Sequence, residues 1–386
     1  MKIKRFHAEN FRNIESCDIS LSPGVNLFVG MNAQGKTNAV EGIYMFSRGK
    51  SHRTSDDKEM IRFGTDGFRI GIEYESEDGI ETLEYACFGR ERARKKNGYK
   101  ISRVAEMIGS FKSVLFYPDN IEIVKDGPEE RRAFLNVAIS QVYPSYLGYY
   151  TRFKEALEAR NRLLKLSREQ YVAREDIDAW SHSMAEYASY IYVLRVEYLK
   201  KLEVYTSRVA KELSGGLEDV TLEYKSDVEP SAVRGEENHL IEVPTDIDRE
   251  AVVREYYRIL TASLERECAA GSSLWGPHRD DVIIRINGTA ARSFASQGQK
   301  RSVVLAMKLA EGEVIRELFG EYPVFLFDDV LSELDENRRR YIIEGMRDRQ
   351  IIITSCEADE IKDFADCVIE VEGGRYVPTY RQRQEH

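Results

Sequence analysis

One short stretch of the chain has the residue types and spacing to bind a chain of phosphates. Residues 30–37 read GMNAQGKT and fit the phosphate-binding loop pattern G-x-x-x-x-G-K-[ST]. Gly30 and Gly35 let the backbone curl until successive N–H groups face one anion. Lys36 adds a mobile charge for the β and γ phosphates, and the Thr37 hydroxyl is placed to bind Mg²⁺ beside them. A glycine-rich turn that matches by chance is the alternative, but the flanking residues, apolar before and helix-forming after, argue against it.

A second group of reactive side chains follows an apolar run in the last quarter of the chain. Residues 324–327 (VFLF) predict a buried strand, and Asp328 and Asp329 come directly after it. Parallel α/β sheets bind their ligands beyond the carboxyl ends of the strands. We therefore expect Asp328 to hold the Mg²⁺ that Thr37 also contacts, and Asp329 to orient or deprotonate an attacking water.

Two predicted helices begin with residues that suit a helix cap or an anion. Ser296 is a good N-cap for the helix whose apolar stripe begins at Val303. Gly298 and Gln299 then stand with Ser296 at the positive end of that helix, although S-x-G-Q alone indicates no more than a capped helix. The segment SELD, which ends at Asp335, caps the next helix.

The remaining pattern supplies the elements that must position these groups. Strands are expected over residues 2–8, 16–22, 25–29, 220–224, 282–286 and 350–354, and a hairpin over 68–88. Helices are expected over 38–46, 146–166, 180–213 and 248–268, the second and third of these as an antiparallel pair. Residues 214–247 are rich in Gly, Asp, Glu and Ser and are expected to form loops around one short strand.

The most basic run of the chain surrounds a turn at Asn97 and Gly98. Its cations, with Tyr99 beside them, could contact a DNA backbone, since they supply charge for phosphates and one stacking ring. The run contains Arg90, Arg92, Arg94, Lys95, Lys96 and Lys100, of which the last five are the candidate DNA contacts. An ordinary solvated hairpin tip is an equal alternative. The loop over residues 47–54 (SRGKSHRT) has the same two interpretations, and there the solvated loop is favoured.

Composition limits the class of protein. The 386 residues carry a formal net charge of −10, so a nucleic acid would have to bind at a local basic surface. No apolar run approaches the roughly 18 residues of a membrane span, and no secretion signal is visible. The five cysteines are scattered without a C-x-x-C pair, which argues against a disulfide framework or a zinc site and favours a reducing cytoplasm.

Taken in order, these motifs resemble the ABC-type ATPases of the branch related to SMC proteins. FRN near the start, SHRT after the first helix, GPHRDD before a strand, SQGQKR and LFDDVLSELD together resemble the RecF family of bacterial recombination mediators. The resemblance implies an α/β fold: an ABC-type P-loop ATPase head with a mixed sheet, flanking helices and an antiparallel β subdomain, into which a mainly helical lobe is inserted. It implies an ATPase domain at residues 1–117 and 265–386 and a lobe at 118–264.

The same resemblance implies an ATP-dependent homodimer that uses Mg²⁺ and holds two ATP molecules between its subunits. It gives catalytic roles to Lys36, Asp328, Asp329 and Ser296, and metal-binding roles to Thr37 and Asp328. Nucleotide-binding roles fall to Arg12, Asn13, Gly30, Met31, Asn32, Ala33, Gln34, Gly35, Lys36, Thr37, Ser296, Gly298, Gln299 and Asp335. Ser296 would contact the γ-phosphate held by the other subunit, and Asp335 would couple the two sites.

The function implied for the family is binding of single-stranded and double-stranded DNA at gaps or junctions, in DNA repair, replication and the SOS response. RecO and RecR are the implied partners, and loading of RecA is the implied outcome. Asp329 stands where many ABC ATPases have Glu, and Ser355-Cys356 stands where transporters have His. Both departures predict an ATPase that hydrolyses slowly and acts as a switch, and the resemblance implies that this ATPase is weak and DNA-dependent.

Two other classes of protein use the same loop. One is the nucleotide-binding subunit of a membrane transporter. The long separation between Lys36 and Asp328 disfavours this class, because one compact α/β domain does not need so many residues between the two motifs. The other is a small-molecule kinase, which would leave Ser296 and the SELD segment without a use.

Overall fold

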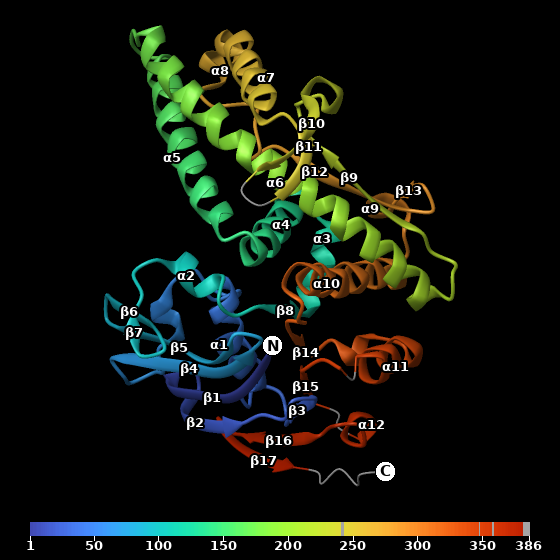
Figure 1. Cartoon of the computed structure of the whole chain (residues 1–386). Helices are drawn as coiled ribbons and strands as arrows, with labels where there is room; N and C mark the ends of the chain where they lie inside the picture. Colours follow the sequence, from blue (N-terminus) through green and yellow to red (C-terminus); the bar gives the residue numbers. More distant parts are fainter. Residues whose placement is uncertain (241–242, 347, 357–358, 381–386) are drawn as a thin grey trace. The chain divides into compact units, whose positions relative to one another are not determined.

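The computed structural model describes residues 1–240, 243–346, 348–356 and 359–380. The chain forms two compact units, whose elements are labelled in Figure 1. The first unit comprises Met1–Ile121, Arg208–Leu217 and Arg301–His386, and the second comprises Glu122–Ser207 and Glu218–Lys300. Both ends of the chain therefore contribute to the first unit.

The sheet that carries the phosphate-binding loop lies in the first unit and is mostly parallel. In spatial order its strands are β17 (Arg375–Tyr380), β16 (Cys367–Glu372), β3 (Val25–Val29), β15 (Ile351–Ser355), β14 (Val324–Asp328) and β8 (Ser113–Phe116). Of these pairs, β16 and β17 are antiparallel and the others are parallel. β14 and β15 are buried at every residue, as central parallel strands are. The strands expected over 25–29, 324–327 and 350–354 are thus confirmed.

The second sheet of this unit is antiparallel. In spatial order its strands are β2 (Ile14–Ser20), β1 (Lys2–Phe11), β4 (Gly67–Ser76), β5 (Gly79–Phe88), β6 (Glu91–Lys96) and β7 (Tyr99–Lys100). The hairpin expected over 68–88 is confirmed as β4 and β5. Asn97 and Gly98 join β6 to β7, and both have the positive φ that such two-residue turns require.

Helix α1 (Lys36–Arg48) forms the centre of the core of the first unit. It contacts β1 and β4 of the antiparallel sheet and β8, β14 and β15 of the parallel sheet. Gly42 permits this close packing, since a Cβ there would lie 3.2 Å from the Phe6 ring. The shorter helices of this unit are η1 (Asp57–Met60), α2 (Val104–Ile108), η2 (Pro118–Ile121), η4 (Leu331–Glu333), α11 (Glu336–Gly345) and α12 (Asp359–Lys362).

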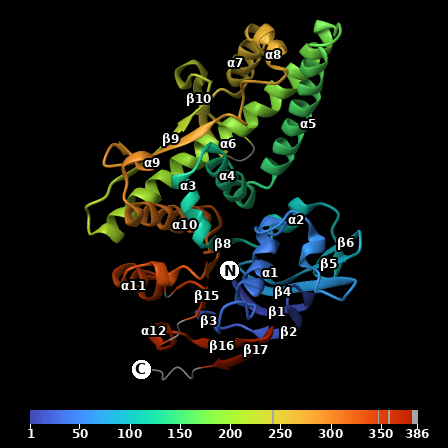
Figure 2. The same ribbon diagram turned by 180° about the vertical axis from the view of Figure 1, so that it is seen from behind.

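The second unit is built on a long helical hairpin, which confirms the expected antiparallel pair. α5 (Ser145–Leu166) and α6 (Arg174–Ser214) run side by side (Figure 2). Tyr149 stacks on Tyr190 with ring centroids 4.1 Å apart, and Arg160 Nε donates to Ser181 Oγ over 2.9 Å. The other helices are α3 (Glu122–Lys125), α4 (Pro128–Val142), η3 (Pro230–Val233), α7 (Arg249–Ala262), α8 (Leu264–Ala270) and α9 (Ala291–Phe294). α10 (Gln297–Phe319) begins in this unit and continues into the first.

The second unit contains more strand than the sequence predicted. β9 (Val220–Lys225) pairs with β12 (Asp281–Ile286), which also pairs with β13 (Thr289–Ala290). β10 (Arg234–Leu240) pairs with β11 (Val243–Ile247), so the expectation of loops on both sides of a single strand over 214–247 is wrong. β10 and β11 pair although the sequence there is polar, because their facing backbone N–H and C=O groups can bond to each other. The helix expected over 248–268 is in fact α7 and α8, which are separated at Ser263.

The compact units also differ from the expected domain boundaries. Residues 265–300 belong to the second unit, because β12 pairs with β9 and Arg131 forms an ion pair with Asp281 at 2.6 Å. The division into an ATPase domain at 1–117 and 265–386 and a lobe at 118–264 stays a prediction.

Candidate functional site

The phosphate-binding loop joins β3 to α1 in a backbone conformation that requires glycine. Gly35 has a φ of 117°, and Ala33 is left-handed with a φ of 64°. A Cβ at Gly30 would lie 2.2 Å from the Val371 carbonyl oxygen, so no other residue fits there. The two glycines of the motif are therefore explained by geometry, one by its φ and the other by close contact.

The Lys36 ammonium group lies inside the loop. Its Nζ donates to the carbonyl oxygens of Gly30 at 2.6 Å and Met31 at 3.0 Å, and it lies 3.3 Å from Cys356 Sγ. Lys36 is only 6% exposed. Its three donors can turn from these acceptors to phosphate oxygens, because all of them sit on one rotatable ammonium.

Thr37 and Asp328 come together at the carboxyl end of the sheet. Thr37 Oγ1 donates to Asp328 Oδ1 over 2.9 Å, and Thr354 Oγ1 donates to the same oxygen over 2.7 Å. Burial raises the pKa of Asp328 above its ordinary value, although the hydrogen bonds from Thr354 and Thr37 oppose that shift. One hydroxyl, from the start of α1, and one carboxylate, from the end of β14, suit Mg²⁺, which takes its remaining ligands from phosphates and water. Within the described residues no cluster of three or more His, Cys, Asp or Glu side chains could hold a metal by itself.

Asp329 lies just beyond this pair in a strained conformation. Its φ is 54°, in the left-handed region, and its backbone N–H donates to Thr354 Oγ1 over 2.9 Å. The residue is exposed, in contrast to the buried Asp328. Its side chain thus lies at the surface beyond the end of β14, and its role toward a water molecule stays a prediction.

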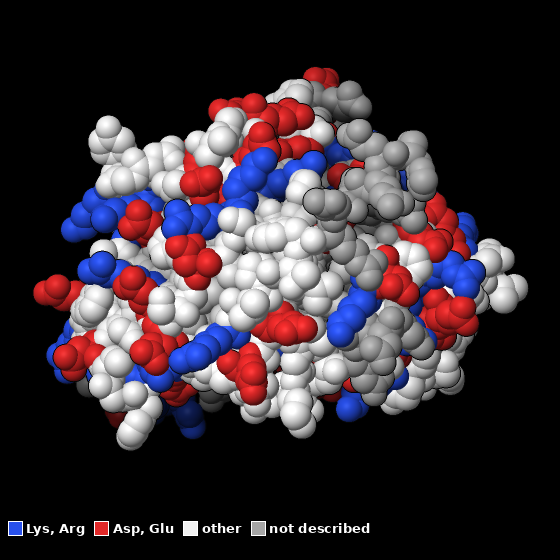
Figure 3. Space-filling model, turned by 90° about the horizontal axis from the view of Figure 1, so that it is seen from below, with Lys and Arg blue, Asp and Glu red and all other residues white. Residues whose placement is uncertain are grey.

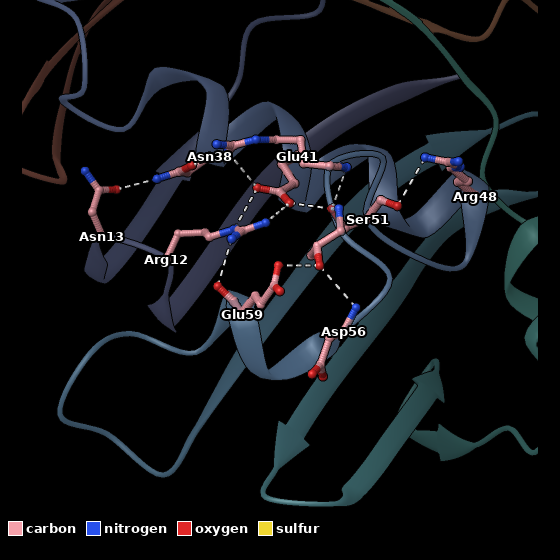
Figure 4. Close-up of polar contacts among 10 residues, drawn as sticks. Arg12, Asn13, Asn38, Glu41, Arg48, Ser51, Asp56 and Glu59 are labelled. Atoms are coloured by element: carbon pink, nitrogen blue, oxygen red, sulfur yellow. Dashed lines mark hydrogen bonds and ion pairs between the residues drawn. The ribbon is translucent and has the colours of Figure 1, made fainter. Parts of the chain in front are cut away.

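Arg12 lies in the turn between β1 and β2 and binds a buried carboxylate (Figure 4). Its Nε and Nη2 donate to Glu41 of α1 over 3.0 and 2.7 Å. Arg53 Nη1 donates to the same carboxylate over 3.0 Å, and the Ser51 hydroxyl donates to it as well. Burial opposes the charge of Glu41, but the hydrogen bonds from Arg12 and Ser51 outweigh it and hold the pKa below its ordinary value. Sequence reasoning missed Glu41, although a glutamate among the apolar residues of α1 was a signal.

Asn13 connects this network to the loop. Asn38 Nδ2 donates to Asn13 Oδ1 over 2.7 Å, and that oxygen would lie 2.7 Å from a Cβ at Gly35. The structure thereby brings Asn13 to the loop, and the nucleotide-binding roles of Arg12 and Asn13 stay a prediction. The Arg12 donors are directed to Glu41 and to the Glu59 carbonyl oxygen.

The SRGKSHRT segment is not simply a solvated loop. Ser51 is buried, and the His52 ring packs against Tyr44 and Tyr117 with centroid distances of 5.7 and 5.1 Å. Burial lowers the pKa of His52 to about 4, so the ring is neutral near pH 7. The interpretation as a solvated loop is wrong for these two residues, because Ser51 donates to the buried Glu41 carboxylate and His52 packs against the two tyrosines.

Ser296, Gly298 and Gln299 belong to the second unit. Ser296 Oγ accepts from Gln299 N over 3.2 Å, and Gln299 Oε1 accepts from Ser296 N over 3.0 Å, which is a reciprocal cap at the start of α10. Gly298 lies between them on the exposed first turn. Asp335, in the first unit, is the N-cap of α11 and accepts from Arg338 N over 3.0 Å. Both helix caps predicted from the sequence are confirmed.

The cations of the basic hairpin are largely paired with acids. Arg92 forms an ion pair with Asp57, Lys96 pairs with Glu81 at 2.8 Å, and Lys95 pairs with Glu84 at 3.6 Å. The remaining two differ: the Arg94 guanidinium lies over the Tyr85 ring at 5.2 Å, and Lys100 is exposed. Acidic and basic side chains are likewise interspersed over the face seen in Figure 3.

The fold and site define a P-loop ATPase head of the SMC type. A family model described as "RecF/RecN/SMC N terminal domain" matches residues 2–374. The chain is 35% identical over 367 residues to the "DNA replication and repair protein RecF" of Clostridium novyi, covering 95% of this chain and 96% of that one. It is also 35% identical to the protein of the same name from Clostridioides difficile, covering 94% of both chains. The chain therefore belongs to the RecF family.

Solved structures agree with this assignment. Two structures described as the recombination mediator protein RecF-ATP and RecF-ATPrS in the RecFOR pathway each match with a TM-score of 0.87 and 32% identity. The match covers 99% and 97% of this chain and 98% and 97% of those chains, respectively. An SMC head bound to a domain of ScpA matches with a TM-score of 0.57 at 15% identity, which supports the fold alone. The expected family and fold class are thus confirmed.

The transporter alternative has no support from these relatives, which are named for DNA replication and repair. Among the described residues, none of the helices has the length and apolar character needed to cross a membrane.

Proposed function

We propose that this chain is an ATP-dependent DNA-binding switch that acts in recombinational repair and at replication forks. The observation that carries the proposal is the Thr37–Asp328 hydrogen bond of 2.9 Å beside the Lys36 ammonium, in a chain whose solved relatives are described with ATP. ATP is the substrate and Mg²⁺ the metal that fit this arrangement. The relatives carry the assignment to DNA repair and replication.

The proposed roles follow from what each group offers. The N–H groups of the loop and Lys36 bind the phosphates, while Thr37 and Asp328 hold the metal. When bound, ATP with Mg²⁺ supplies a charged tail whose terminal phosphate can be removed by water. Asp329 orients or deprotonates that water, and because its side chain is one methylene shorter than Glu, hydrolysis is slow.

The proposed active form is a homodimer that depends on ATP. Ser296 and Gly298 are exposed at the start of α10, with Gln299 beside them, and the Ser296 hydroxyl at the positive end of this helix suits a γ-phosphate held by a second copy. Asp335, at the start of α11, couples the two sites. Loss of the γ-phosphate removes the charge that joins the copies, which is how a slow ATPase acts as a switch.

The proposed partners are single-stranded and double-stranded DNA, with RecO and RecR, for loading RecA at gaps in the cytoplasm. The relatives described as part of a RecFOR pathway support this assignment. The candidate DNA contacts are Arg92, Arg94, Lys95, Lys96 and Lys100. Because three of these form ion pairs, DNA would have to compete with Asp57, Glu81 and Glu84 for them.

Light scattering with and without ATP, Mg²⁺ and DNA tests the proposal. The unmodified chain should form dimers with ATP, and Lys36→Met should bind no ATP and stay monomeric. A chain that binds ATP yet remains a monomer at high concentration with a non-hydrolysable analogue would contradict the dimeric switch. If Lys36→Met bound ATP normally, the site assignment itself would be wrong.

A further inference from the structure

The hairpin formed by β16 and β17 touches the backbone of the phosphate-binding loop. β16 lies next to β3, from which the loop emerges (Figure 1). Gly373 N donates to Gln34 Oε1 over 2.6 Å, and Gly374 N donates to the Gln34 carbonyl oxygen over 3.0 Å. Tyr376 Oη donates to the Gly35 carbonyl oxygen over 2.7 Å. Two carbonyl groups of the loop are thus held by a segment that lies more than 300 positions further along the chain.

These contacts fix the direction of two loop N–H groups. In a planar trans peptide the C=O and the following N–H point in opposite directions. Holding the Gln34 oxygen therefore orients the N–H of Gly35. The Gly35 oxygen also accepts from the N–H groups of Asn38 at 3.0 Å and Ala39 at 3.3 Å, and the Tyr376 hydroxyl adds a third bond that helps to orient the N–H of Lys36. Both N–H groups belong to the anion-binding turn at the start of α1.

Close packing reinforces this arrangement. A Cβ at Gly374 would lie 2.5 Å from the Asn13 carbonyl oxygen, and one at Gly30 would lie 2.2 Å from the Val371 oxygen. The Tyr376 ring meets the Phe28 ring edge-on with centroids 6.1 Å apart, so its position does not depend on the hydroxyl alone. Burial raises the pKa of Tyr376, which keeps the hydroxyl protonated and able to donate.

We propose that the β16–β17 hairpin is part of the nucleotide site, with Tyr376 and Gly374 as positioning residues that orient the Gly35 and Lys36 N–H groups toward the phosphates. This inference rests on the proposed function, since it requires that ATP binds the loop. Coupling is reciprocal, so bound ATP stabilises the hairpin by the same factor as the hairpin strengthens binding.

Calorimetric titration with Mg-ATP tests the role of the hydroxyl. Tyr376→Phe keeps the ring and removes one hydrogen bond, so the Kd for ATP should rise about five-fold, equivalent to about 1 kcal/mol. The matched control is Tyr380→Phe, which removes a hydroxyl bond of 2.9 Å to the Ser20 carbonyl oxygen in the same hairpin. Its Kd should stay at the value of the unmodified chain, while both variants unfold at similar temperatures without nucleotide.

A second pair of variants tests the turn. Gly374 and Gly373 both have positive φ, at 80° and 55°, but an added Cβ meets nothing within 4 Å at Gly373. Gly374→Ala should therefore weaken ATP binding more than Gly373→Ala, beyond the backbone strain that both share. Hydrogen exchange on the unmodified chain gives a check without mutation, because the Gly373 and Gly374 amides should exchange more slowly when ATP is bound.

The outcomes separate this inference from the proposed function. If the unmodified chain binds ATP, Lys36→Met does not, and Tyr376→Phe and Gly374→Ala bind like their controls, the hairpin role is overturned and the proposed function stands. If the unmodified chain binds no ATP, both are overturned.

Discussion

Thr37 Oγ1 and Asp328 Oδ1 lie 2.9 Å apart although 291 positions separate them in the chain. They meet because β3 and β14 flank β15 in one parallel sheet, so their carboxyl ends share an edge. Thr354, at the end of β15, completes the arrangement by donating to Asp328. Three strands thereby place one carboxylate beside the loop, where a metal can join it to phosphates.

The first prediction concerns that metal. ATP should bind the unmodified chain more tightly with Mg²⁺ than with a chelator, and Asp328→Asn should remove most of the gain, about ten-fold or more. Titration with and without EDTA measures the difference. Asp66→Asn, at an exposed aspartate of the first unit, should keep the full effect of Mg²⁺. An equal gain in Asp328→Asn would mean that Asp328 does not hold the metal.

The second prediction concerns the buried carboxylate of Glu41. Glu41→Gln should lower the free energy of unfolding by about 2 kcal/mol, because two guanidinium groups lose a charged acceptor inside the fold. Urea unfolding at pH 7 measures this loss. Glu59→Gln, whose carboxylate accepts from Thr54 at the surface, is the control and should change stability much less. If both variants lost the same free energy of unfolding, burial of the Glu41 charge would not be the cause of the loss.

The third prediction concerns pH. Folded His52 has a pKa of about 4, below its ordinary value of 6.5, so the unfolded chain binds the proton more readily between these values. Stability of the first unit should therefore fall as the pH drops below 6.5, by on the order of 2 kcal/mol at about pH 5. His52→Phe should reduce this fall, whereas His182→Phe, at a 60% exposed side chain, should not. Unfolding curves at pH 6.5 and at about pH 5 measure the loss of stability in each variant. The same loss in His52→Phe as in the unmodified chain would exclude His52 as its source.

The fourth prediction concerns the second copy. Ser296→Arg should bind ATP normally but fail to form homodimers, because the long cation replaces the hydroxyl at the start of α10. Mixing Ser296→Arg with Lys36→Met should restore one intact site per dimer if the serine acts across the interface. Light scattering measures the population of dimers. Homodimers of Ser296→Arg formed as readily as those of the unmodified chain would rule out this role.

The fifth prediction concerns DNA. Charge reversal of Lys95 and Lys96 to Glu should weaken DNA binding and lower the magnitude of its salt slope by about two, one for each lost phosphate contact. Lys154→Glu, on the exposed surface of α5, is the control. The affinity for DNA, measured over a range of salt concentrations, distinguishes the hairpin variant from this control. An unchanged slope in the hairpin variant would move the DNA contact to another surface.

Local patterns in the sequence determined the loop, the two helix caps and the buried strands. The glycine spacing of residues 30–37, the serine and aspartate before two helices and the unbroken apolar run before Asp328 each depend on neighbours within a few positions. Hairpin turns such as Asn97-Gly98 were equally clear, because few residues tolerate the positive φ values that they need. Recognition of the family followed from the order of these motifs.

Beyond the Thr37–Asp328 pair, which the motifs predicted, tertiary structure alone decided which distant groups meet. The burial of Glu41 under Arg12 and Arg53 and the hydrogen bond from Tyr376 to the Gly35 carbonyl oxygen join remote segments whose own sequences do not identify the partner. The physical reason is that secondary structure follows from short-range periodicity, whereas hydrogen bonds between remote segments depend on strand order and on which polar groups are left buried together.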